Sequence, residues 1–110
     1  MMYVVYRTHL TPEARADLPR FWRWVHEREP WFYRDFTTIK WVRRYVTVVG
    51  PSYTVETWQA FEDMAAYAEY LRQVAQHKAD PEWERRRVEQ DRYWEFLDNR
   101  ILTDAPLPQG

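Results

Sequence analysis

Residues 39–60 read IKWVRRYVTVVGPSYTVETWQA, and this stretch decides the fold. Two runs rich in β-branched and aromatic residues, 39–49 and 53–60, are each typical of a strand. The Gly-Pro-Ser between them, residues 50–52, is typical of a tight turn. The stretch therefore predicts a β-hairpin in the middle of the chain.

A strand and a helix are predicted on the N-terminal side of this hairpin. Residues 2–9 are β-branched and aromatic and form a run too short for a stable helix. Residues 11–13 (Thr-Pro-Glu), and again 17–19 (Asp-Leu-Pro), combine a capping side chain with an early proline, which is a helix-start signal. Pro30 is expected to end or bend this helix, because an interior proline costs about 3 kcal/mol.

A second helix and a closing strand are predicted on the C-terminal side. Apolar residues recur at helical spacing between Met64 and Ala75, and residues 80–82 (Asp-Pro-Glu) start a third, short helical turn. Residues 93–101 suit a strand. Residues 104–110 are expected to form a flexible tail, which leaves 1–103 as a single domain.

The resulting order of strand, helix, strand, strand, helix, strand is the βαββαβ pattern of ferredoxin-like domains. Right-handed crossovers then give an α+β fold, a four-stranded antiparallel sheet with helices on one face. The other face would carry Trp41 and Tyr45. The 110 residues include seven Trp, eight Tyr and five Phe, more aromatic surface than a small monomer hides easily. We therefore expect a homodimer in which two sheets cover each other.

Composition and charge argue against several classes of function. The 16 basic and 17 acidic residues leave a net charge of −1, without the basic field typical of nucleic-acid binding. Cysteine is absent, which excludes disulfides and thiolate metal sites. The histidines lack ligand spacing and the two glycines form no phosphate loop, so we predict no metal and no cofactor. Without a membrane-length apolar run or a leader, we expect a cytoplasmic protein.

Several local phrases resemble the dimeric α/β-barrel superfamily, and within it the NIPSNAP-like proteins. They are residues 50–51 (Gly-Pro), the strand-like run 53–61 with Trp58, residues 65–67 (Ala-Ala-Tyr) and residues 80–83 (Asp-Pro-Glu-Trp). The resemblance implies a ferredoxin-like protomer and a dimer whose two sheets face each other. The superfamily also contains cofactor-independent monooxygenases, cyclases and haem-degrading enzymes. The NIPSNAP-like proteins supply no established catalytic residues to transfer.

Charged and aromatic side chains within the predicted strands are candidates for a ligand pocket. His9 ends the first strand, beside the start of the second hairpin strand, where an imidazole could act as a base or a ligand. Arg43 shares strand parity with Tyr45. Glu56 shares it with Trp58, so a polar pocket with aromatic walls could form. A partly wet histidine and cross-strand ion pairs are the commoner explanations. The candidates are Arg7, His9, Trp41, Arg43, Tyr45, Glu56 and Trp58.

Three functions fit these observations. The first is a protein that binds a small apolar or aromatic ligand in a pocket beside or between the sheets, since the surplus aromatics come without a catalytic grouping. The second is a cofactor-independent monooxygenase or cyclase for an aromatic or polyketide-like substrate, with strand residues transferring protons or stabilising an oxyanion. The third is a purely structural interaction module, favoured if the space between the sheets is fully packed.

Overall fold

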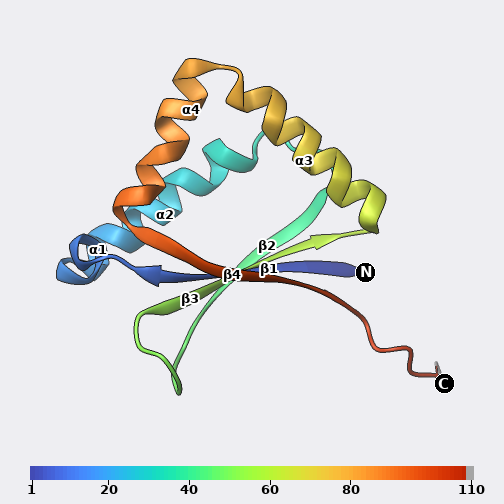
Figure 1. Cartoon of the computed structure of the whole chain (residues 1–110), viewed down its shortest axis with the longest axis horizontal. Helices are drawn as coiled ribbons and strands as arrows, with labels where there is room; N and C mark the ends of the chain where they lie inside the picture. The colour runs from blue at the N-terminus through green and yellow to red at the C-terminus, as the bar shows by residue number, and fades with distance from the viewer. Residues whose placement is uncertain (109–110) are drawn as a thin grey trace.

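The computed structural model describes residues 1–108, which form the predicted four-stranded antiparallel sheet with the helices packed on one face (Figure 1). The strand order is β2-β3-β1-β4, and every neighbouring pair is antiparallel, as in ferredoxin-like domains. The predicted fold class is confirmed. The elements are β1 (Met2–Leu10), α1 (Pro12–Ala16), α2 (Leu18–Tyr33), β2 (Ile39–Val46), β3 (Thr54–Phe61), α3 (Met64–Lys78), α4 (Pro81–Arg87), the 3₁₀ helix η1 (Val88–Arg92) and β4 (Trp94–Thr103).

Side-chain caps set the helix starts. The Thr11 hydroxyl accepts a hydrogen bond from the Ala14 amide and begins α1, whereas the Asp17 carboxylate accepts from the Arg20 amide and begins α2. Both predicted start signals are therefore used, one for each helix. Asp80 caps α4 in the same way.

The two largest boundary differences from the sequence prediction are at the ends of β2 and α2. Strand β2 ends at Val46, and the two valines that follow, Val48 and Val49, are 91% and 92% exposed. Their β propensity does not extend the strand, because no layer covers the hairpin tip. Helix α2 continues through Pro30 to Tyr33. Burial of Phe32 on its last turn offsets the hydrogen bond that proline cannot make.

Two apolar clusters fill the space between the sheet and the helices. Phe61 and Phe32 belong to one, and Phe21 and Val55 belong to the other. Strand β1 contributes to both, with Met2 and Val4 in the first cluster and Leu10 in the second. The members are Met2, Val4, Phe32, Phe36, Phe61, Tyr70 and Trp83 in the first cluster, and Leu10, Ala14, Phe21, Val25, Val55, Tyr93 and Trp94 in the second.

Strand β4 lies at one edge of the sheet. Its pairing with β1 shifts register between Arg7 and Thr8, where Leu97 has no partner on β1. The chain beyond β4 has no regular structure through residue 108. Residues 109–110 of the expected tail lie outside the described residues. Within residues 1–108, no helix is long and apolar enough to cross a membrane.

Candidate functional site

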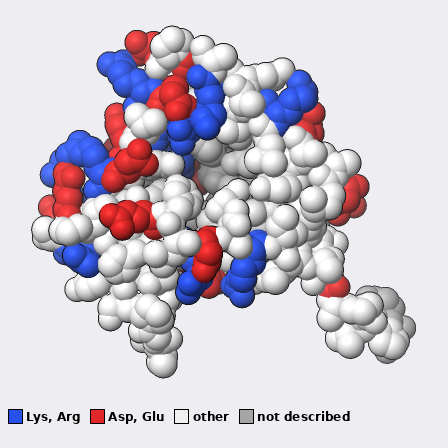
Figure 2. Space-filling view, viewed as in Figure 1, with Lys and Arg blue, Asp and Glu red and all other residues white. Residues whose placement is uncertain are grey.

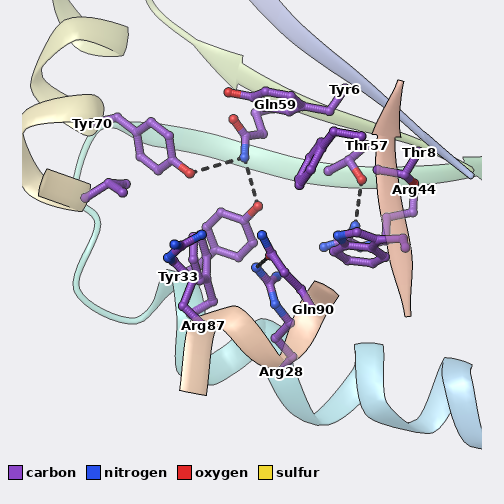
Figure 3. A pocket seen from close by; sticks show the side chains of 14 residues that line it. Tyr6, Thr8, Arg28, Tyr33, Arg44, Thr57, Gln59, Tyr70, Arg87 and Gln90 are labelled. Atoms are coloured by element: carbon purple, nitrogen blue, oxygen red, sulfur yellow. Dashed lines mark hydrogen bonds between the residues drawn. The ribbon is translucent and has the colours of Figure 1, made fainter. Parts of the chain in front are cut away.

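A cavity of about 200 Å³ lies between the helix-covered face of the sheet and the helices (Figure 3). Tyr6 and Thr8 of β1 and Thr57 and Gln59 of β3 line it from the sheet. On both strands these residues stand between the two apolar clusters, so the cavity separates the clusters. Figure 2 shows a hollow on this side of the molecule, with charged side chains gathered beside it over α4.

Two tyrosine hydroxyls meet at one side of the cavity. The Gln59 amide nitrogen donates to the Tyr33 hydroxyl at 2.9 Å and to the Tyr70 hydroxyl at 3.3 Å (Figure 3). Burial raises the pKa of Tyr33 and of Tyr70, so both stay protonated at neutral pH. Since each hydroxyl oxygen accepts from Gln59, its own proton is free to bond another acceptor.

Arg28 of α2 places a buried guanidinium in the same cavity. The side chain is 7% exposed and lies over the Phe32 ring, 4.2 Å from its centroid. One terminal nitrogen, Nη2, donates to the Gln90 Oε1 atom at 3.0 Å. Burial lowers the pKa of Arg28, but a guanidinium keeps its charge in proteins.

Two further arginines border the cavity, and each has a carboxylate partner. Arg44 of β2 pairs with Glu29 of α2 and donates from Nη1 to the Thr57 hydroxyl at 2.6 Å. Arg87 of α4 pairs with Glu84, one helical turn earlier. The Arg44–Glu29 pair connects α2 to the sheet beside the cavity, whereas the Arg87–Glu84 pair lies within α4.

Three buried side-chain atoms lack a hydrogen-bond partner within residues 1–108: Arg28 Nε, Gln59 Oε1 and Trp94 Nε1. All three residues line the cavity. Each such atom costs about 1–3 kcal/mol in a folded protein, and buried polar groups are otherwise almost always paired. Three such residues in the lining of one cavity make it the candidate site.

The seven residues predicted from the sequence lie on the opposite face of the sheet. Side chains alternate between the two faces along a strand, and in the paired strands these seven fall on the face away from the apolar clusters. On β2 the candidates alternate with three residues of the other face, Val42, Arg44 and Val46. Of these three, Arg44 lines the cavity. None of the seven lines the cavity described above.

On this face, which no helix covers and which we call the open face, contacts connect five of the seven residues, and a sixth, Arg7, binds Asp98. Arg7 donates two-pronged hydrogen bonds to Asp98, and the Trp58 indole donates to Glu56 at 3.0 Å. The Tyr45 ring meets the Trp58 ring edge to face. On the same face, the Arg43 guanidinium lies 4.2 Å from the Trp41 ring centroid, and Tyr3 contacts both tryptophans.

The seventh, His9, lies at the end of β1. It pairs in register with Thr54 of β3, as its position in the sequence predicted, and with Glu95 of β4. No group of three or more His, Cys, Asp or Glu side chains within residues 1–108 is placed to hold a metal ion.

The comparisons with known proteins agree on the fold. No protein-family model and no curated protein matches the chain. Among solved structures, an uncharacterized NIPSNAP domain protein from Burkholderia xenovorans is 17% identical with a TM-score of 0.73, covering 100% of both chains. A NIPSNAP family protein from Agrobacterium tumefaciens is 18% identical with a TM-score of 0.68, covering 96% of this chain and 95% of its own.

An antibiotic biosynthesis monooxygenase is 16% identical with a TM-score of 0.52, covering 98% of this chain and 100% of its own. The fold is therefore shared with NIPSNAP-family proteins and with a monooxygenase of the same ferredoxin-like architecture. The fold that the sequence resemblance implied is confirmed.

The raised pKa values of Tyr33 and Tyr70 predict a pH dependence. A tyrosine that ionises at higher pH folded than unfolded stabilises the folded state below pH about 10. This stabilisation is lost as the pH rises from there toward the folded pKa. In the native protein, phenolate absorbance should therefore rise with pH in two phases. In the protein unfolded by urea, it should rise in one phase near pH 10. Tyr70→Phe should reduce the late phase; a single native phase would contradict the burial of these hydroxyls.

Proposed function

We propose that the chain is a NIPSNAP-like homodimeric protein that binds a small aromatic molecule in the cavity between the sheet and the helices. The supporting observation is that Arg28, Gln59 and Trp94, the residues with unpaired buried atoms, all border this cavity. The rings of Phe32 and Trp94 supply apolar walls. Such a lining, apolar with a few convergent polar groups, is typical of small-ligand sites.

The cavity volume limits the ligand to a small molecule. An apolar cavity of about 150 Å³ holds benzene, so about 200 Å³ suits one substituted ring or two fused rings. A purely structural module gains nothing from polar side chains at this depth, because apolar residues at Thr57 and Gln59 would join the two clusters into one core.

Dimerisation is proposed through the open face of the sheet. Trp41 and Trp58 are only half-buried there and Tyr45 is 48% exposed in the single chain. A second copy would cover these rings, and a stable interface needs about 800 Å² from each partner. The seven sequence-predicted residues would then border the space between the two sheets, where a second pocket remains a prediction.

Narrowing the cavity should weaken binding of a neutral aromatic probe. Val74 lines the cavity from α3, so Val74→Phe would occupy part of the space that 1-aminonaphthalene needs. We expect at least about tenfold weaker binding, equal to about 1.4 kcal/mol, measured by probe fluorescence at pH 7. Val49→Phe, the same change at a 92% exposed position, should bind like the unchanged protein. Equal affinities for the two variants would place the probe elsewhere.

A charge on the open face should separate the subunits. Tyr45→Glu would bury a carboxylate between the sheets, whereas Tyr53→Glu makes the same change on the hairpin turn at the same 48% exposure. Sedimentation at micromolar concentration should give a dimer for the unchanged chain and for Tyr53→Glu. Tyr45→Glu should give a folded monomer. A monomeric unchanged chain would refute the dimer.

Cofactor-independent oxygenation is a second candidate, because Arg28 and the Tyr33 and Tyr70 hydroxyls are placed to stabilise a phenolate or enolate oxygen. In that reaction a ring methylene of the substrate supplies the electrons. One atom of molecular oxygen becomes a ring carbonyl and the other leaves as water.

Oxygen uptake tests this candidate. With a panel of one-ring and two-ring phenols, whose keto tautomers carry a ring methylene, the protein should consume oxygen faster than buffer, and Arg28→Met should abolish the difference. Equal uptake by the protein, the variant and buffer across the panel would exclude oxygenation of these substrates and leave ligand binding as the function.

A further inference from the structure

The charges around the cavity are not balanced. Arg44 and Arg87 have carboxylate partners, Glu29 and Glu84, whereas Arg28 has none within residues 1–108. No acidic side chain lines the cavity in this part of the chain. A buried cation without a direct ion-pair partner is costly to keep, and Glu29, which attracts Arg28 at longer range, is already bound by Arg44.

The hydrogen-bonding groups that face the cavity are mainly donors. The Tyr33 and Tyr70 hydroxyls accept from Gln59 and keep their protons available. The Arg28 guanidinium lines the same cavity and carries hydrogen-bond donors only. A ligand that satisfies this set carries several acceptor oxygens in one place.

Neighbouring side chains hold the Arg28 guanidinium in position. It lies over the Phe32 ring at 4.2 Å and 5.5 Å from the Trp94 ring centroid, and Gln90 holds its Nη2 atom. A planar fork held in this way binds a carboxylate through two parallel hydrogen bonds, better than a flexible ammonium would. A ligand ring would pack against the aromatic side chains beside the guanidinium, Phe32 and Trp94.

We propose that the ligand of this cavity is an aromatic carboxylate whose charge pairs with Arg28. The inference rests on the proposed binding function and specifies its ligand class. The carboxylate oxygens accept from the guanidinium and from the tyrosine hydroxyls, and the ring packs among the aromatic walls.

Calorimetric titration at pH 7 tests this proposal with three one-ring probes that differ in charge. Benzoate should bind, and benzyl alcohol should bind about 10- to 100-fold more weakly, the factor expected for a hydrogen bond to a charged group. Benzylamine, a cation, should not bind. These comparisons use the unchanged protein and do not depend on any variant folding.

Variants then assign the effect to one side chain. Arg28→Met should lower benzoate affinity to that of benzyl alcohol, and Arg28→Lys should restore part of it because the charge remains without the fork. Arg23→Met, the same change at an exposed position of α2, should leave benzoate binding unchanged.

The outcomes separate this inference from the proposed function. Equal affinities for benzoate and benzyl alcohol would overturn the carboxylate assignment while supporting an aromatic pocket. If 1-aminonaphthalene and all three one-ring probes failed to bind, both proposals would fall. Benzoate binding that Arg28→Met and Arg23→Met lower equally would place the anion away from Arg28.

Discussion

The central strands of the sheet must bury one face under the helices, and the structure depends on how they do so. On β1 and β3 the buried positions change from apolar to polar and back to apolar, from Val4 through Tyr6 and Thr8 to Leu10 on β1. The helices therefore pack on two separate apolar clusters. The space between the clusters is held open by polar side chains that cannot close it without losing their hydrogen bonds.

The fold could be predicted because its signals are local. Strand composition around a Gly-Pro-Ser turn and the capping residues Thr11, Asp17 and Asp80 specify the element order, and the structure uses each of them. The misplaced boundaries have a different origin. Val48 and Val49 favour a strand, and Pro30 disfavours a helix, but the layers that cover or fail to cover those residues decide the outcome.

Part of the candidate site could be predicted from the sequence and part could not. Thr8, Thr57 and Gln59 occupy the same strand parity as buried apolar neighbours, so polar residues at these buried positions were a readable signal. The charged strand residues that suggested a pocket lie instead on the open face. Arg28 and Tyr33 come from a helix that crosses the sheet, and no local pattern states which strand residues they meet.

The register shift at Leu97 has a consequence for how copies of this chain can associate. An edge strand with regular exposed hydrogen-bonding groups is a template for adding strands without limit. Strand β4 interrupts that template with its irregular pairing and with charged side chains at Glu95, Asp98 and Arg100. Both features discourage another strand from pairing along β4 and so oppose sideways growth into fibrils.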